Sequence, residues 1–158
     1  MKLPLLVLAT VFLCVATFIV LIGVGVSRAE QRLDPIGQFI TVNGVKLHYV
    51  VAGAGPGIML VHGASSNLRE FSSSLLPVLA KTHRVIAFDR PGYGFSERPS
   101  EQGGWLNPVQ VADLLLDASE SLGVSKPMIV GHSWAGSVVM SALVHLPERI
   151  SAGVLLSG

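Results

Sequence analysis

Residues 3–26 contain no charged side chain, and this run of 24 residues limits the fold more than any other feature of the sequence. As a helix the run would extend about 36 Å, enough to cross a hydrocarbon core of about 30 Å. We therefore predict one N-terminal transmembrane helix. The alternative is a cleaved signal peptide, because Ser27 and Ala29 would place small residues on either side of Arg28 before a cut. A signal-peptide apolar core is usually only about 7–15 residues long, which favours the uncleaved anchor.

The flanking charges determine the orientation of this segment poorly. Lys2 and the amino terminus precede it, and Arg28 and Arg32 follow it, so the basic residues are nearly balanced. An N-terminal apolar segment that starts translocation would place the rest of the chain outside the cytoplasm, and we predict that arrangement. Cys14 lies in mid-span after Leu13, which is too bulky for a lipoprotein processing site, so we interpret Cys14 as a small apolar residue.

The composition excludes several classes of protein. Half of the residues are apolar, which excludes a disordered chain, and the single cysteine excludes a disulfide framework or a cysteine-rich zinc site. A net charge of +1 without a basic cluster argues against nucleic-acid binding. We predict an anchor or signal segment over residues 1–31 and one small domain over residues 32–158.

The pattern of apolar residues in the second region predicts an alpha/beta fold. After a polar linker over residues 28–37, β-rich runs at 39–42 and 45–52 are joined by Asn43-Gly44, a strong hairpin signal because both turn positions need a positive φ. Further strands are expected at 58–61, 84–88, 128–130 and 152–157, and helices near 71–80, 107–122 and 134–146. Strands that alternate with helices indicate a mostly parallel sheet with helices on both faces.

The helix expected after Asn107 has clear start signals and a polar face. Asn107 is suited to the N-cap, Pro108 to the first helical position and Gln110 to the capping box. Asp113, Asp117 and Glu120 recur on one side of this helix. We interpret these acids as a solvated face rather than a metal site, and we expect neither a metal nor a cofactor.

Ser133 is the candidate nucleophile. Residues 131–136 read Gly-His-Ser-Trp-Ala-Gly and lie between an expected strand and an expected helix. A serine at such a turn is displayed at the carboxyl edge of the sheet on a strained backbone, near the free N–H groups of a helix start. The strand and the helix pass close to each other there, so the residues two before and two after the serine must be small. Gly131 and Ala135 meet that need.

A second segment supports this interpretation. His62, Gly63 and Ala64 directly follow the expected strand at 58–61, and a loop there can direct backbone N–H groups at the carbonyl that Ser133 would attack. We predict that the N–H groups of Ala64 and Trp134 form an oxyanion hole. We expect His62 to brace the loop through hydrogen bonds rather than to transfer protons.

Three motifs now make the sequence resemble the N-terminal part of an alpha/beta-hydrolase superfamily member of the serine-hydrolase branch. They are the His-Gly-Ala-Ser at 62–65, the Asp-Arg-Pro-Gly-Tyr-Gly-Phe-Ser at 89–96 and the segment at 131–136. The resemblance implies that Ser133 is the nucleophile and that the segment 89–96 is a structural loop. Ala135 stands where the branch usually has glycine. Serine rather than aspartate as the nucleophile argues against the dehalogenase and epoxide-hydrolase branches, which attack with a carboxylate.

The acid and base that such a serine needs are not evident in the sequence. After Ser133 the sequence contains one histidine, His145, and one acidic residue, Glu148. His145 would lie roughly 18 Å from Ser133 along the helix, too far to act as its base. We interpret His48 and His83 as structural or exposed, and the resemblance implies that His132 points away from the attack site. The chain is therefore interpreted as the front part of a hydrolase, ending after about the sixth strand.

Two functions remain at this point. The first is a membrane-anchored serine hydrolase that acts through an acyl-enzyme on a small-molecule substrate with an ester-like carbonyl, here without the acid and base of its triad. The second is a non-enzymatic anchored module that binds a partner through an exposed sheet edge. The sequence that follows Gly158 would discriminate between them.

Overall fold

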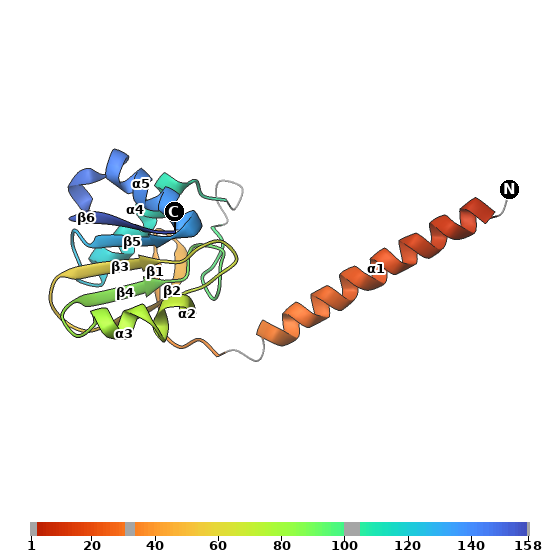
Figure 1. The fold of residues 1–158 in the computed structure, drawn as a ribbon, viewed down its shortest axis with the longest axis horizontal. Helices are drawn as coiled ribbons and strands as arrows, with labels where there is room; N and C mark the ends of the chain where they lie inside the picture. The colour runs from red at the N-terminus through yellow and green to blue at the C-terminus, as the bar shows by residue number, and fades with distance from the viewer. Residues whose placement is uncertain (1–2, 31–33, 100–104, 158) are drawn as a thin grey trace. The chain divides into compact units, whose positions relative to one another are not determined.

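The computed structural model describes residues 3–30, 34–99 and 105–157 (Figure 1). The internal contacts divide the chain into two compact units, Met1–Asp34 and Pro35–Gly158. The elements, in chain order, are α1 (Leu3–Glu30), β1 (Gln38–Val42), β2 (Val45–Ala52), β3 (Gly57–Val61), α2 (Arg69–Ser72), α3 (Leu75–Leu79), β4 (Arg84–Phe88), α4 (Pro108–Ser121), β5 (Met128–His132), the 3-10 turn η2 (Ser133–Ala135), α5 (Gly136–His145), the 3-10 turn η3 (Pro147–Arg149) and β6 (Ala152–Leu156).

The first unit is the single helix α1. Its part Val7–Gly25 has a mean hydropathy of 2.8 and is long and apolar enough to cross a membrane, a test that a signal sequence would also pass. The helix continues to Glu30, so the predicted start of a linker at Arg28 was wrong. Ala29 and Glu30 are good helix formers, and the first residue that opposes a helix is Pro35.

The second unit is built on a six-stranded sheet of order β1-β2-β4-β3-β5-β6. The strands β4, β3, β5 and β6 run parallel, and β1 and β2 add an antiparallel hairpin at one side. Asn43 and Gly44 form the hairpin turn with φ values of +50° and +76°, as the sequence predicted. The predicted alpha/beta class with a mostly parallel sheet is confirmed.

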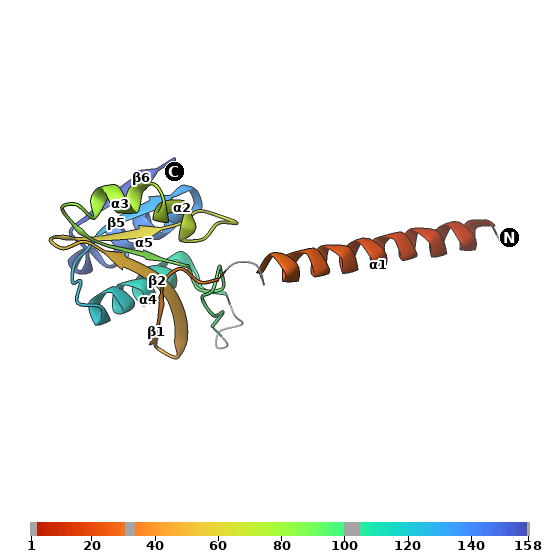
Figure 2. The ribbon, with the colours of Figure 1, turned by 90° about the horizontal axis from the view of Figure 1, so that it is seen from below.

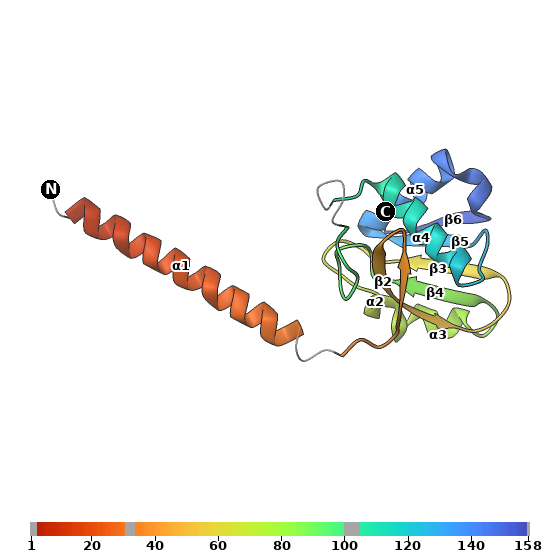
Figure 3. The same cartoon turned by 180° about the vertical axis from the view of Figure 1, so that it is seen from behind.

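Alternate residues of the central strands face two separate apolar layers. Met59 and Val61 of β3 pack in the layer that contains α4 and α5, whereas Ile58 and Leu60 pack in the layer that contains α2 and α3. Helices therefore cover both faces of the sheet (Figure 2), and the face covered by α4 is turned toward the reader in Figure 3. A strand buried on both faces must be apolar at every position, which is the run that the sequence shows at 58–61.

Two helical regions illustrate how local signals act. Helix α4 has the predicted capping box, because Asn107 Oδ1 accepts the Gln110 N–H and Gln110 Oε1 accepts the Asn107 N–H, both at 2.9 Å. The single helix predicted near 71–80 is instead two short helices. The hydroxyl groups of Ser72 and Ser74 donate to backbone carbonyls of the preceding turn, and such bonds compete with a continuing helix.

Candidate active site

The carboxyl ends of three neighbouring strands meet at one edge of the sheet. Strand β3 lies between β4 and β5, with Val61 opposite Phe88 on one side and Gly131 on the other. The residues that directly follow these strands are therefore brought together although they are far apart in the sequence. They are the loop at 62–65, the loop that begins with Asp89 and Arg90, and the turn at Ser133.

Ser133 occupies a sharp turn between β5 and α5. Its φ is +50°, a left-handed conformation that costs a non-glycine residue energy, and the residue is exposed. Gly131 shows how closely the strand and the helix approach, because a Cβ there would lie 2.6 Å from the Ala135 carbonyl oxygen. Ala135 itself is fully buried. The turn thus has the small flanking residues and the strained serine that the sequence indicated.

Gly63 brings the loop after β3 against this turn. A Cβ on Gly63 would lie 3.3 Å from Ser133 Cβ and 3.1 Å from His132 Nδ1. A side chain at position 63 would therefore crowd the serine. The neighbouring Ala64 is exposed, and Ser65 follows it in the left-handed conformation with a φ of +53°.

His62 is fully buried, and backbone groups occupy both of its ring nitrogens. Nε2 accepts the Arg90 N–H at 3.0 Å, so Nδ1 carries the proton and donates to the Gly63 carbonyl oxygen at 2.9 Å. Burial is the main cause that lowers the pKa of His62 from 6.5 to about 4. These contacts join the loop after β3 to the loop after β4 and leave the ring without a free nitrogen for proton transfer.

Arg90 is a buried cation beside the serine turn. One of its Nη atoms donates to the Gly63 carbonyl oxygen at 2.9 Å, and its guanidinium carbon lies 4.1 Å from the ring centroids of both Tyr93 and Trp134. Its Nε is buried without a hydrogen-bond partner in the described part of the chain. Burial lowers the pKa of Arg90 from its ordinary value. The sequence showed Arg90 only as part of the motif at 89–96, which was expected to be a structural loop.

Asp89 organises the rest of the loop after β4. Its carboxylate accepts the N–H groups of Leu68 and Phe95 and the Nδ1–H of His48, the last at 2.7 Å. The Ser96 hydroxyl donates to the Asp89 carbonyl and accepts the His48 N–H. The segment at 89–96 is therefore a loop stabilised by internal hydrogen bonds, and the Asp89 carboxylate is used to hold it in place.

His132 precedes the serine and faces α2 instead of the turn. Its Nδ1 lies 2.6 Å from Glu70 Oε1, and the other oxygen of Glu70 accepts the Gly63 N–H at 3.5 Å. Among the residues that the structure describes, no histidine ring is hydrogen-bonded to the Ser133 hydroxyl. His83 contacts Thr82, and His145 ends α5.

The acidic face of α4 is engaged by a cation. Arg149 lies within ion-pair distance of Asp113, Asp117 and Glu120, at 2.7 Å from Asp117 and 3.2 Å from Glu120. No group of three metal-ligating side chains is found among the described residues.

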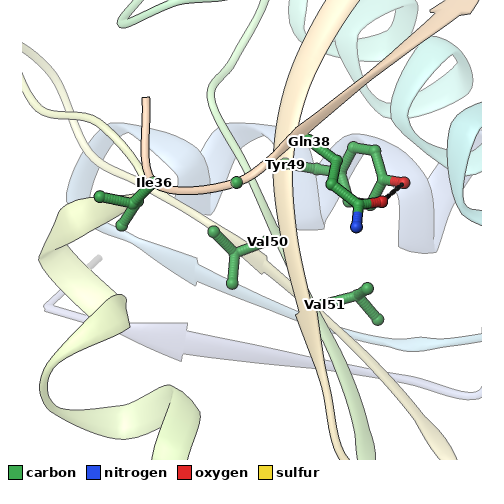
Figure 4. A pocket seen from close by; sticks show the side chains of 6 residues that line it. Ile36, Gln38, Tyr49, Val50 and Val51 are labelled. Carbon is green, nitrogen blue, oxygen red and sulfur yellow. Dashed lines mark hydrogen bonds between the residues drawn. The ribbon is translucent and has the colours of Figure 1, made fainter. Parts of the chain in front are cut away.

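A shallow hollow lies beside β1 and β2 (Figure 4), and its lining residue Gly37 donates its N–H to His48 Nε2 at 3.2 Å. Its lining consists of Ile36, Gly37, Gln38, Tyr49, Val50 and Val51. The Tyr49 hydroxyl donates to Gln38 Oε1 at 2.9 Å, so the two polar side chains of the hollow satisfy each other. Its one ionisable lining side chain, Tyr49, is thus committed to Gln38.

Comparison with known proteins agrees with the fold. The family model described as the alpha/beta hydrolase fold matches residues 56–158. The chain is 30% identical over 131 residues to 2-hydroxymuconate semialdehyde hydrolase from Pseudomonas sp. (strain CF600), covering 82% of this chain and 46% of that protein. It is 33% identical over 118 residues to epoxide hydrolase 3 from Siraitia grosvenorii, covering 75% of this chain and 37% of that protein.

Solved structures show the same similarity. An epoxide hydrolase from Vigna radiata matches with a TM-score of 0.67 and 29% identity over 77% of this chain and 39% of that one. The enzyme Est816, described as degrading N-acyl homoserine lactones, matches with a TM-score of 0.67 and 28% identity over 76% of this chain and 45% of that one. This chain spans less than half the length of these proteins.

Proposed function

The chain belongs to the alpha/beta-hydrolase fold family, and on that premise we propose that it carries the nucleophile of a serine hydrolase. Ser133 attacks an ester-like carbonyl, an acyl-enzyme forms, and water releases the acid. The observation that carries the proposal is the turn at Ser133, where an exposed serine with a φ of +50° lies between β5 and α5. Ser65 is also exposed with a positive φ, but Ser133 is the serine that directly joins a strand to a helix, the place where a nucleophilic serine is displayed in this fold.

The oxyanion that forms during the attack needs hydrogen-bond donors beside Ser133. We assign this role to the N–H groups of Ala64 and Trp134. The proximity of Gly63 to Ser133 supports the assignment, because the Ala64 N–H belongs to the peptide that follows Gly63. One such donor typically contributes about 2.7–4 kcal/mol to lowering the barrier.

The residue at the turn also bears on the substrate class. The compared proteins include both a semialdehyde hydrolase and epoxide hydrolases. By resemblance, the epoxide-hydrolase branch attacks with a carboxylate, whereas position 133 holds a serine. We therefore propose a substrate with a carbonyl group at the reacting centre rather than an epoxide.

The base and the acid of the triad are proposed to come from outside these 158 residues. Both ring nitrogens of His48 and of His62 have hydrogen-bond partners other than Ser133. His132 Nδ1 lies 2.6 Å from Glu70, and the ring is not hydrogen-bonded to the Ser133 hydroxyl in the described part of the chain. We further propose that α1 anchors the protein in a membrane with the hydrolase part outside the cytoplasm. The apolar span Val7–Gly25 supports the anchor.

The alternative function is a membrane-anchored binding module without catalysis. The exposed side chains at the β6 edge and on α5, such as Leu155 and Val144, favour it as a surface for a partner. The experiment below separates the two functions.

The test is covalent labelling of Ser133 in the complete gene product. A fluorophosphonate probe and p-nitrophenyl ester turnover would be measured for the wild type, for Ser133→Ala and for Ser121→Ala. Ser121 is the matched control because it is an exposed serine at the end of α4, away from the strand ends that form the site. We expect labelling and turnover in the wild type and in Ser121→Ala and their loss in Ser133→Ala. The 158-residue chain by itself is expected to show only background turnover.

Two results would contradict the proposal. Turnover that survives Ser133→Ala would remove Ser133 as the nucleophile. A complete gene product that ends at Gly158 and neither reacts with the probe nor hydrolyses the ester would favour the binding module.

A further inference from the structure

We infer that Arg90 is a positioning residue for the oxyanion hole and that its guanidinium group orients and polarises the peptide between Gly63 and Ala64. The inference rests on the proposed function of Ser133 and extends it to a residue outside the turn. The observations that carry it are the bond from Arg90 to the Gly63 carbonyl and the contact of the guanidinium with Trp134.

The geometry of one peptide group links Arg90 to the proposed donor. The Gly63 carbonyl and the Ala64 N–H belong to the same planar unit, and in a trans peptide they point in opposite directions. The carbonyl oxygen accepts two hydrogen bonds at 2.9 Å, one from Arg90 and one from His62 Nδ1. These two donors fix the orientation of the Gly63–Ala64 peptide plane. Because the plane is rigid, they also fix the direction of the Ala64 N–H on its opposite side.

The charge of Arg90 adds a second effect. A hydrogen bond from an ionised donor is roughly twice as strong as one between neutral groups. It draws electron density toward the carbonyl oxygen, and bonds in such a chain strengthen one another by roughly 10–30%. The Ala64 N–H therefore becomes a better donor to a developing negative charge than an isolated amide would be.

Trp134 connects Arg90 to the other proposed donor. The guanidinium carbon lies 4.1 Å from the centroid of the Trp134 ring, within the range of a cation–π contact. The Trp134 N–H belongs to the peptide that directly follows Ser133. Arg90 thus contacts the Gly63–Ala64 peptide in the loop after β3 and the Trp134 side chain in the turn after β5.

The cost of burying Arg90 supports a role for its charge. The residue is 2% exposed, and its Nε has no partner among the described residues. A buried cation that is incompletely bonded loses hydration that an apolar side chain of similar length would not lose. A role in packing alone would be filled at lower cost by such a side chain. Arg84 is the comparison: it too has a buried Nε without a partner among the described residues and one bond to a backbone carbonyl, that of Leu122. Arg84 is only half-buried, however, and it lies at the start of β4, at the opposite end of the strand from the site.

The test compares Arg90→Met, Arg90→Lys and Arg84→Met in the complete gene product. Methionine keeps an unbranched stem between the aromatic rings and removes the charge, and lysine keeps the charge with a different donor geometry. We expect Arg90→Met to lower kcat by about tenfold or more while KM changes less than about twofold, since a lost oxyanion donor costs about 10²–10³. Arg90→Lys should retain part of the rate, and Arg84→Met should keep kcat.

A trifluoromethyl ketone that forms a tetrahedral adduct with Ser133 provides the readout that a merely structural role would not move. Its affinity should fall in parallel with kcat in Arg90→Met, whereas the affinity of an uncharged, non-reacting substrate analogue should not. Equal losses of both affinities, or an unchanged kcat, would overturn the inference.

The failure of this inference differs from the failure of the proposed function. If Ser133→Ala abolishes turnover but Arg90→Met keeps it, only the positioning role is wrong. If Ser133→Ala keeps turnover, the proposed function is wrong, but the polarisation of the Gly63–Ala64 peptide by Arg90 can still be tested. In a nuclear magnetic resonance spectrum of the 158-residue chain, the Ala64 amide proton should shift upfield in Arg90→Met and not in Arg84→Met. The absence of that shift would overturn the polarisation by Arg90 independently of any catalysis.

Discussion

The substitution Gly131→Ala tests the closest contact of the serine turn. A Cβ at position 131 would lie 2.6 Å from the carbonyl oxygen of Ala135 and 2.6 Å from Val139 Cγ2. An ordinary van der Waals contact begins at 3.4 Å, so the start of α5 would have to move by about 0.8 Å relative to β5. A backbone oxygen cannot rotate out of the way as a side chain can, so the strain must be taken up by the turn itself.

The expected cost follows from this geometry. Overpacking of a close-packed interior typically costs about 1–3 kcal/mol, and a clash with backbone belongs in the upper half of that range. Replacing glycine by alanine also reduces the entropy of the unfolded chain, which returns about 0.4–1 kcal/mol. We therefore expect Gly131→Ala to lower the free energy of unfolding by about 1–2.6 kcal/mol.

Gly153→Ala is the matched control because Gly153, in β6, faces the same helix. Its added Cβ would lie 2.7 Å from Val139 Cγ1 and 2.9 Å from Leu143 Cδ1. The nearest atoms are thus side-chain atoms, and the leucine can change its rotamer. We expect this variant to lose less than half of the unfolding free energy that Gly131→Ala loses.

Urea unfolding of the full chain in a mild detergent would measure both variants. Trp105 and Trp134 both belong to the second unit, so their fluorescence reports its unfolding. The midpoint should fall clearly for Gly131→Ala at an unchanged slope. A wild-type midpoint for Gly131→Ala, or an equal loss for Gly153→Ala, would refute the idea that β5 and α5 touch through their backbones.

Three further predictions concern the turn, the buried histidine and the anchor. Ala135 is fully buried, so Ala135→Val should lower both the melting temperature and the ester turnover of the complete gene product, while Ala135→Gly should be tolerated. Wild-type values for the valine variant would show that Ser133 does not lie in a tight strand-to-helix turn. Because the folded chain holds the pKa of His62 at about 4 while the unfolded value is 6.5, the unfolded state binds more protons between these values. The free energy of unfolding should therefore fall as pH drops from 6.5 to 4, by up to about 3 kcal/mol. His62→Gln should remove that part of the pH dependence, and the control His83→Gln, at a half-buried histidine that contacts Thr82, should not. The chain should remain in the membrane pellet after carbonate extraction, and a soluble form that begins at Glu30 would instead indicate cleavage.

The sequence by itself determined the elements whose signals are local. The apolar run at 58–61 specified a strand buried on both faces, and Asn43-Gly44 specified a hairpin because few other pairs accept a positive φ at both positions. Asn107 and Gln110 marked the start of α4 through bonds that span three residues. The strained turn at Ser133 is also specified locally, because Gly131 and Ala135, the small residues two before and two after the serine, indicate it in the sequence.

The weakest local predictions were the ends of helices without a strong stop. The sequence shows Phe71 and the apolar residues up to Ala80 at a helical spacing. It does not reveal that the hydroxyls of Ser72 and Ser74 donate hydrogen bonds to backbone carbonyls of the preceding turn. Likewise, the polar residues after Val26 suggested a linker, although their helix propensity allowed α1 to continue to Glu30.

The surroundings of the serine were decided only by the tertiary structure. Arg90 reaches the Gly63 carbonyl across 27 residues of sequence, and His48 reaches Asp89 across 41. These contacts exist because the parallel order β4-β3-β5 brings the carboxyl ends of three strands to one edge. Periodicity along the chain reports which face a residue occupies, but it carries no information on which distant loop will lie beside it. The motif at 89–96 therefore includes Arg90 but does not reveal that its guanidinium lies against Gly63 and Trp134, whereas a serine at a strand-to-helix turn is evident from its neighbours.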